Sequence, residues 1–324
     1  MGFSSKNDYF FYILGEFSLK GENIRSRGDF LNYYDEIKKE LLNNEITKKV
    51  KNYSINKSDL TTYYNIGKLL KEAGKHYGEG IIKEYSRRLT SEFGKGYTFT
   101  SLTRMKKFYN LIEKLATVSQ HLSYGHYVEL LPYSDIDKIN YYIKITEEEK
   151  LSVRELRQKI KSNEYERLDE ETKNKLKNKE ELKVPDLVKN PIQIRNTSDY
   201  NEISEKVLQK LILEDIPSFL KELGNGFSFI DSEYKIKIGD RYNYIDLLLF
   251  NYEFNCFVVV ELKVSELKKE HIGQIEFYMN YIDKNLKSIN QNKTIGIIIC
   301  KKENKYVIEY CSDDRIIARE YELI

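Results

Sequence analysis

The sequence NYIDLLLFNYEFNCFVVVELKV, residues 243–264, contains two apolar runs of strand length. Both runs, residues 244–250 and 256–264, are rich in β-branched and aromatic side chains, which favour β-strands. The join between them, NYEFN, is short enough for a hairpin. The stretch therefore predicts two adjacent strands of a buried sheet.

Three charged residues interrupt this apolar stretch: Asp246, Glu261 and Lys263. Glu261 and Lys263 are two positions apart, so on a strand they point to the same face of the sheet. If the hairpin folds about its middle, Asp246 lies nearly opposite Glu261. We therefore expect two carboxylates and one ammonium group to meet at one point of the sheet.

Two interpretations of this cluster are open, because a buried charge is costly unless it is paired or bound to a metal. In the structural interpretation, Glu261 and Lys263 form an ion pair and Asp246 is an ordinary acid near a turn. In the chemical interpretation, the two carboxylates hold Mg²⁺ or Mn²⁺, which prefer hard oxygen ligands. Lys263 then positions a water molecule and offsets charge on a phosphate. We favour the chemical interpretation because all three charges occur on one apolar hairpin.

The order Asp246, then Glu261-Leu262-Lys263 on the next strand, resembles the D…ExK signature of the PD-(D/E)xK nuclease superfamily. The surrounding segments resemble the C-terminal nuclease domain of the YhcG-type family, whose N-terminal half is a domain of largely unknown function. These segments are ELGNGFSFI (222–230), YIDLLLFN (244–251), VVELKV (259–264), IGQIEFYMNYID (272–283) and IGIIIC (295–300). The resemblance covers residues 190–310 well and residues 33–160 more loosely.

The resemblance implies a restriction-endonuclease-like α/β domain with an αβββαβ core. It also implies metal-dependent hydrolysis of phosphodiester bonds. Asp246 and Glu261 would be the ligands of Mg²⁺ or Mn²⁺, and Lys263 would position water and stabilise charge.

The same resemblance gives supporting roles to two residues on helices. Gln274 lies on the helix after the ExK strand, where it shares a face with its i+4 neighbour Tyr278. Glu205 lies near the start of the helix that precedes the first strand of the core, and would help to bind metal or water. Glu205 can also be interpreted as a solvated acid that the helix dipole favours.

The first half of the chain contains a helix, a glycine turn and a second helix, in residues 79–93, 94–96 and 101–116. This helix-turn-helix-like layout is typical of DNA-binding proteins, and the YhcG-type N-terminal half has the same run and has been thought to bind DNA through it. The alternative is a plain helical hairpin with a solvated basic face. The basic residues around the turn are Arg87, Arg88, Lys95, Arg104, Lys106 and Lys107.

A change of composition separates the two halves. Residues 163–196 are charged, low in apolar residues and contain Pro185 and Pro191, which is typical of a linker. We therefore predict an all-helical N-terminal domain in residues 1–162, a linker in residues 163–196 and the nuclease domain in residues 197–324.

The overall composition limits the partners and the compartment. The 53 Lys and Arg residues nearly balance the 51 Asp and Glu residues, so a surface that binds nucleic acid must be local. The three cysteines, without CxxC or paired-histidine spacing, predict buried thiols in a reducing cytoplasm and give no support for zinc. The start of the chain does not resemble a signal peptide, and no apolar stretch is long enough to span a membrane.

These features together predict a cytoplasmic, Mg²⁺- or Mn²⁺-dependent nuclease that acts on DNA rather than RNA, in genome defence or DNA processing. The alternative is a nucleic-acid-binding or scaffold subunit on a nuclease fold, active only within a larger complex. Its partners would be a second copy of the chain or the subunits of a defence system. The intact D…ExK set weighs against the alternative, since a site that has lost its catalytic activity need not keep all three residues.

Overall fold

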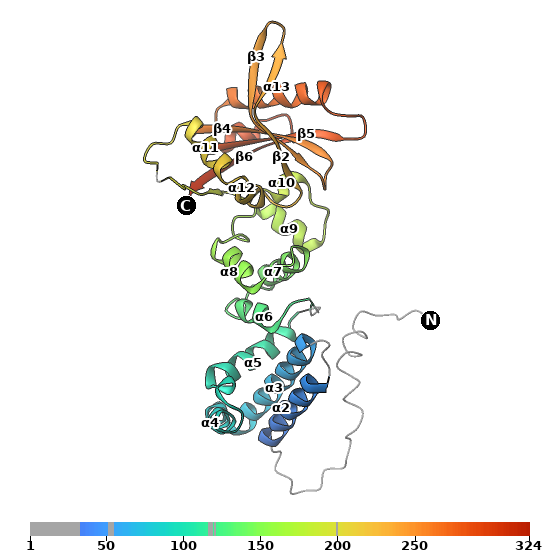
Figure 1. Cartoon of the computed structure of the whole chain (residues 1–324), viewed down its shortest axis with the longest axis vertical. Coiled ribbons are helices and arrows are strands. Elements are labelled where there is room, and N and C mark those ends of the chain that lie inside the picture. The colour runs from blue at the N-terminus through green and yellow to red at the C-terminus, as the bar shows by residue number, and fades with distance from the viewer. Residues whose placement is uncertain (1–32, 51–54, 116–118, 120, 199) are drawn as a thin grey trace, which may run out of the picture. The chain divides into compact units, whose positions relative to one another are not determined.

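The computed structural model describes residues 33–50, 55–115, 119, 121–198 and 200–324 (Figure 1). The chain divides into two compact units, Met1–Ser162 and Asn163–Ile324. The start of the chain, where the sequence predicts no signal peptide, lies outside the described residues, as does the beginning of the helix that we predict over residues 30–44. In the described part of the chain, no helix has both the length and the hydropathy that crossing a membrane requires.

The first unit is helical throughout its described residues. Its core forms where apolar side chains recur at helical spacing, as with Ile66, Leu70 and Ala73, all fully buried. The sequence predicts that Gly74 and Gly78 break the helix that contains them. The helix continues through Gly74 to Tyr77 and ends before Gly78, which has a φ of 79°. The elements are α2 (Tyr33–Val50), α3 (Ile55–Tyr77), α4 (Ile81–Phe93), η1 (Lys95–Tyr97), α5 (Phe99–Ile112), α6 (Tyr124–Leu130), α7 (Ile136–Glu148) and α8 (Val153–Lys161).

The second unit is built on a six-stranded mixed sheet of order β1-β6-β5-β4-β3-β2. Strands β2, β3 and β4 are antiparallel neighbours, whereas β4, β5, β6 and β1 pair in parallel. The strands are β1 (Ile192–Ile194), β2 (Phe227–Ile238), β3 (Arg241–Asn251), β4 (Cys256–Glu266), β5 (Asn292–Lys302) and β6 (Ile316–Leu323).

Helices cover both faces of this sheet (Figure 1). Helices α11 (Glu205–Glu214) and α12 (Ile216–Leu223) pack on one face, where they meet alternate residues of β5 such as Ile297. Helix α13 (Lys269–Asn285) packs on the other face, against Ile298. The continuous apolar run of β5 is therefore buried on both sides, as the sequence predicts for an interior strand.

The C-terminal end differs from the sequence prediction. The sequence predicts a last strand at residues 306–310, but residues 306–309 lie in helix α14 (Lys305–Glu309), and Tyr310 is the C-cap of this helix. Asn304 caps this helix by accepting a hydrogen bond from the backbone N–H of Val307, and Tyr306 and Tyr310 are exposed. The last strand is β6, because it is β6 that offers buried side chains beside β5.

The charged segment 163–196, interpreted from its composition as a linker, lies within the second unit. It forms α9 (Glu170–Asn178), α10 (Val184–Leu187) and β1, and β1 extends the sheet by pairing with β6. Its charges are used in ion pairs within the unit, such as Arg167 with Glu222 and Asp169 with Arg319. A polar composition is therefore compatible here with packed structure, because the charged groups find partners.

Candidate active site

Asp246 and Glu261 meet where strands β3 and β4 separate. The antiparallel register pairs Leu247 with Val260, so that Asp246 and Glu261 come next in line, as the hairpin pattern predicts. The backbone pairing of β3 with β4 ends at Leu247. Beyond it, the N–H of Leu262 on β4 donates a 2.7 Å hydrogen bond to the side-chain Oδ2 of Asp246. The carboxylate of Asp246 therefore lies in the opening between the two strands.

Glu261 and Lys263 share one face of β4, as their spacing predicts, and both are buried. Nζ of Lys263 lies 2.8 Å from Oε1 of Glu261, and the two residues are 9% and 2% exposed. Gln274 of α13 donates a second hydrogen bond, of 2.7 Å, to the same Oε1. Its amide also lies 3.2 Å from the hydroxyl of Tyr278, so the predicted helical neighbours both reach the site.

Glu205 reaches the same cluster from α11, which covers the face of the sheet opposite α13. It stands in the first turn of α11, after the N-cap Ser204, and its Oε2 lies 3.7 Å from Nζ of Lys263. Because its side chain is half-exposed, Glu205 faces solvent as well as the buried lysine. The structure thus brings Asp246, Glu261, Lys263, Gln274 and Glu205 together.

Burial and mutual repulsion perturb both carboxylates of this cluster. Burial, together with the charge of Asp246, raises the pKa of Glu261 to about 7. Burial also raises the pKa of Asp246, although the hydrogen bond from Leu262 and the charge of Lys263 oppose this rise. Burial alone would lower the pKa of Lys263, but the hydrogen bond to Glu261 and the neighbouring carboxylates outweigh it, so the pKa is raised and the ammonium form is favoured.

One oxygen of this cluster lacks a partner. Oε2 of Glu261 is buried and has no hydrogen-bond partner among the described residues, an arrangement that is costly for a carboxylate. No group of three or more His, Cys, Asp or Glu side chains in the described part of the chain is arranged to hold a metal ion. A pair of carboxylates nevertheless fits Mg²⁺, which is usually held by one or two carboxylates and completes its shell with water and phosphate oxygens.

Two residues that the sequence analysis missed support the site from its edge. Gln209, one turn after Glu205 on α11, donates a 3.0 Å hydrogen bond to the backbone carbonyl of Asp246. Glu233 of β2 lies between Ser232 and Tyr234, whose partners on β3 flank Asp246, and its charge contributes to the raised pKa of Asp246. The i, i+4 spacing from Glu205 could have pointed to Gln209, whereas Glu233 is placed by the strand pairing alone.

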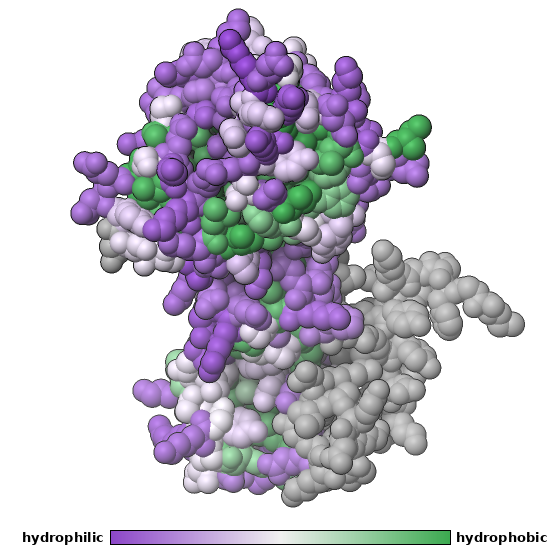
Figure 2. Space-filling model, turned by 45° about the horizontal axis from the view of Figure 1, so that its top comes forward, coloured by the Kyte–Doolittle hydropathy of each residue, from purple (hydrophilic) through white to green (hydrophobic). Residues whose placement is uncertain are grey.

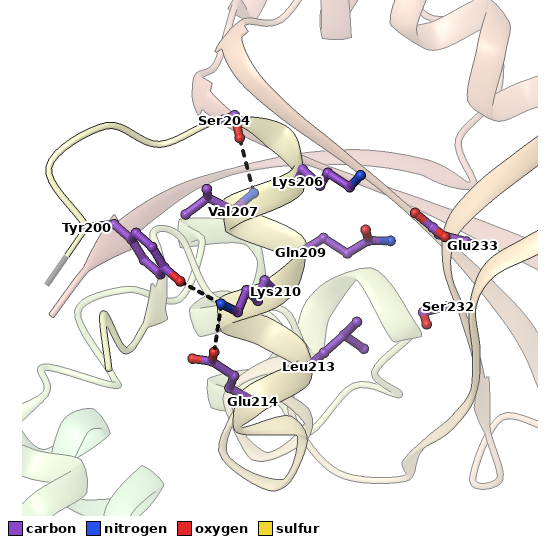
Figure 3. A pocket seen from close by; sticks show the side chains of 10 residues that line it. All are labelled: Tyr200, Ser204, Lys206, Val207, Gln209, Lys210, Leu213, Glu214, Ser232 and Glu233. Carbon is purple, nitrogen blue, oxygen red and sulfur yellow. Dashed lines mark hydrogen bonds and ion pairs between the residues drawn. The ribbon is translucent and has the colours of Figure 1, made fainter. Parts of the chain in front are cut away.

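A pocket of about 670 Å³ lies beside the site, along α11 (Figure 3). Figure 3 shows Gln209 and Lys206 pointing from the helix toward Glu233 and Ser232 on β2. Lys210, which is hydrogen-bonded to Tyr200 at 2.7 Å, lies on the opposite side of the helix. The charged residues of the lining are two lysines, Lys206 and Lys210, and two glutamates, Glu214 and Glu233, and Gln209 connects the pocket to Asp246.

His271 lies one turn before Gln274, where the sequence predicts a surface position, but the structure buries it, with 7% of the residue exposed. Its Nδ1 accepts a hydrogen bond from the backbone N–H of Lys268 at the start of α13. Burial, aided by the positive charge of Lys263, lowers its pKa. A capping role therefore accounts for its position.

The predicted basic residues of the first unit lie on α4, η1 and α5. Two of them contact other side chains of the unit. Arg88 stacks on Tyr34, with its guanidinium carbon 3.5 Å from the ring centroid, and Lys106 is paired with Glu79. The aromatic residues of the turn pack inward: Tyr97 contacts Phe93 and Phe108 is buried. Arg87, Arg88, Lys95, Arg104 and Lys107 are exposed, whereas Lys106 is half-buried.

Two known protein families match the two parts of this chain. Residues 36–167 match the DUF1016 N-terminal domain, and residues 186–324 match the YhcG PDDEXK nuclease domain. The protein named "Putative nuclease YhcG" from Escherichia coli (strain K12) is 24% identical over 317 residues, which are 83% of this chain and 84% of that protein.

Solved structures match over a smaller part. A repair endonuclease from Pyrococcus abyssi is 19% identical, with a TM-score of 0.27, over 39% of this chain and 49% of that chain. An EndoMS–dsDNA2 complex is 20% identical, with the same TM-score of 0.27, over 40% of this chain and 48% of that chain. The chain spans about half the length of these solved structures. From the family matches, the chain belongs to the proteins that join a DUF1016 N-terminal domain to a YhcG PDDEXK nuclease domain, and it is homologous to YhcG of Escherichia coli.

Proposed function

We propose that this chain is a metal-dependent nuclease that hydrolyses phosphodiester bonds in DNA, with Mg²⁺ or Mn²⁺ as its cofactor. The observation that carries the proposal is the buried Glu261. One of its oxygens is held by Lys263 and Gln274, while the other has no partner among the described residues. An ion pair kept only for structure would not need an unsatisfied buried oxygen directed away from its lysine.

Asp246 and Glu261 are the residues that would hold the metal. Both offer hard carboxylate oxygens, and burial raises the pKa of both carboxyl groups, which a bound cation would offset. When bound, Mg²⁺ or Mn²⁺ would supply Lewis-acid stabilisation of the charge that develops on the phosphate. The fixed hydrogen bond from Leu262 to Asp246 holds one ligand in place before any substrate arrives.

Lys263 stabilises charge and positions water. Its raised pKa keeps it protonated at neutral pH, so it acts as a hydrogen-bond donor and a positive charge, not as a base. The carboxylates of Glu261 and Glu205 hold its ammonium group from two sides. In the hydrolysis, a water oxygen forms a bond to phosphorus and one ester P–O bond breaks, which leaves a phosphate end and a hydroxyl end.

The two glutamines act as positioning residues. Gln274 holds Oε1 of Glu261 and so fixes the direction of Oε2, while Gln209 holds the backbone at Asp246. The two supports come from helices on opposite faces of the sheet, so the carboxylates are constrained from both sides. Glu205, half-exposed beside Lys263, is placed to accept a hydrogen bond from a water molecule at the edge of the site.

In this proposal the first unit contributes to DNA binding through its exposed basic residues. Arg87, Lys95, Arg104 and Lys107 are suited to phosphate contacts, which position nucleic acid without reading its sequence. The cytoplasm is the compartment we propose, since the three cysteines, all within the described residues, are free thiols.

The test is a cleavage assay with the purified chain on supercoiled and linear DNA and on RNA. Each substrate is incubated with Mg²⁺, with Mn²⁺ and with a chelator. We expect cleavage of DNA that depends on the metal. Metal-independent cleavage would contradict the proposed cofactor, and cleavage of RNA alone would contradict the proposed substrate. If the chain binds DNA but leaves every substrate intact, it is a binding subunit that needs partners.

A further inference from the structure

The β2–β3 hairpin extends beyond the rest of the sheet. The pairing of β3 with β4 ends at Leu247, whereas β2 and β3 stay paired to the turn, where Ile238 faces Arg241. Residues 234–245 thus form a two-stranded arm, and Figure 1 shows this end of the hairpin projecting past α13. We refer to residues 234–245 as the hairpin arm.

The two faces of the hairpin arm have opposite character. On the inner face, Ile236 and Ile245 are fully buried, and they pack with the core that lies under α13. On the outer face, Tyr242 and Tyr244 are 52% and 51% exposed. The inner face is sufficient to anchor the arm, so the two outer tyrosines are not needed for the core.

Lysines alternate with the tyrosines across the outer face. The strand register places Lys235 opposite Tyr244 and Lys237 opposite Tyr242. Nζ of Lys235 lies 3.8 Å from the centroid of the Tyr242 ring, and Nζ of Lys237 lies 6.0 Å from it. These cation–π contacts keep rings and charges side by side on one surface.

This surface leads directly to the candidate active site. Tyr242 and Tyr244 precede Asp246 on β3 by four and two residues, so the arm joins the candidate active site along this strand. At roughly 3.3 Å per residue, Tyr242 lies about 13 Å from Asp246 along the strand. The outer face and the turn carry the cations Lys235, Lys237 and Arg241 against the single anion Asp240. Figure 2 shows a face of the second unit that is mostly hydrophilic, with smaller hydrophobic patches among the polar residues.

We propose that the outer face of the hairpin arm binds an unpaired stretch of nucleic acid and leads it to Asp246 and Glu261. The inference rests on the proposed nuclease function, and it adds the class of substrate: nucleic acid with a single-stranded segment. Exposed aromatic rings stack on unpaired bases, and nearby lysines contact the phosphates between them. A blunt duplex presents phosphates but keeps its bases stacked inside, so it would use the lysines and leave both tyrosine rings without a partner.

The test measures binding by the full chain in the absence of divalent metal. The probes are labelled oligo-dT, oligo-U and a blunt oligo-dA·oligo-dT duplex, and the readout is fluorescence anisotropy. The variants are Tyr242→Ala with Tyr244→Ala, and Tyr242→Phe with Tyr244→Phe. Tyr252→Ala is the matched control, because Tyr252 is an exposed tyrosine, 63% exposed, in the β3–β4 turn outside the arm. A thermal melt of each variant shows that it is folded.

We expect the alanine pair to weaken single-strand binding about tenfold or more, since each stacked base contributes through a ring. Binding of the blunt duplex should change much less. The phenylalanine pair, which keeps both rings, and the Tyr252→Ala control should bind like the wild type. Changing Lys235 and Lys237 to Gln should flatten the salt dependence on oligo-dT by roughly 0.7 per lost phosphate contact. The oligo-dT and oligo-U probes separate DNA from RNA as the source of the strand.

Failure of the inference can be told apart from failure of the proposed function. If the wild type cuts DNA but the alanine pair binds single strands as the wild type does, the arm is not the binding surface and the nuclease assignment stands. If the alanine pair loses duplex and single-strand binding equally, the single-stranded substrate class is wrong. If the alanine pair loses single-strand binding while the wild type cuts nothing, the arm binds nucleic acid and the proposed catalysis is wrong.

Discussion

Gln274 on α13 donates a 2.7 Å hydrogen bond to Oε1 of Glu261 on β4. Lys263 donates to the same oxygen at 2.8 Å, so both partners of this carboxylate lie on one side. The other oxygen, Oε2, is left buried and without a partner among the described residues. The free oxygen of this carboxylate can therefore bind a cation. Four predictions test this arrangement and the proposed function.

Lys263→Ala should abolish cleavage and leave a folded protein that still binds nucleic acid. The lysine would act on the transition state, where removal of one such interaction costs about a hundredfold or more in rate. The measurement is a melting curve beside a cleavage assay on the same preparation, with the exposed Lys284→Ala of α13 as control. If the Glu261–Lys263 pair were only structural, the variant would lose roughly 3–5 kcal/mol of stability. That loss, or a stable variant that still cuts, would contradict the assignment.

Asp246→Asn should also abolish cleavage, but through weaker metal binding. The amide oxygen can still accept the hydrogen bond from Leu262, so the strand opening should keep its geometry. We therefore expect excess Mn²⁺ to restore part of the cleavage by Asp246→Asn and none of the cleavage by Lys263→Ala. Equal rescue of both variants would show that the two residues do not have the separate roles proposed here.

Glu261 should make the metal-free protein less stable as the pH rises. Burial and the charge of Asp246 raise the pKa of Glu261 from 4.5 to about 7. Between these values the folded chain binds more protons than the unfolded chain, so the free energy of unfolding decreases with increasing pH across this window. Melting temperatures in chelator between about pH 5 and pH 8 should fall less for Glu261→Gln than for the wild type.

The control for this pH dependence is Glu270→Gln, an exposed glutamate at the start of the same helix that carries Gln274. Its curve should run parallel to that of the wild type. Added Mg²⁺ should stabilise the wild type more at pH 8 than at pH 6, because the metal needs the deprotonated carboxylate. A Glu261→Gln curve parallel to the wild type would show that Glu261 does not titrate in this range.

Changing Arg87 and Lys107 to Ala should weaken DNA binding equally for all sequences. Both residues are exposed on the two helices that flank the glycine turn, where they would contact phosphate. The slope of log affinity against log salt should fall by roughly one unit per lost contact. The control is Arg157→Ala, an exposed arginine of α8 that is paired with Glu129. An unchanged slope would assign Arg87 and Lys107 to a solvated face.

Local patterns were sufficient to predict the centre of the second unit. Two apolar runs joined by NYEFN give a hairpin with one register, and the two-residue period places Glu261 and Lys263 on one face. These features depend only on neighbours in the chain, so they can be recognised without knowing the fold. The helical neighbours Gln274 and Tyr278 were predictable for the same reason.

Features that depend on distant contacts could not be predicted in this way. Residues 306–310 are rich in the β-branched and aromatic residues that favour strands, but they form a helix, and β6 takes the place beside β5. The charges of segment 163–196 resemble those of a linker until Arg319 and Glu222 provide partners for them. Gln209 and Glu233 reach Asp246 only because α11 and β2 pack beside β3. Strand pairing and side-chain burial depend on the free energy of contacts between segments far apart in the chain. A local sequence pattern does not identify the distant segment that makes these contacts.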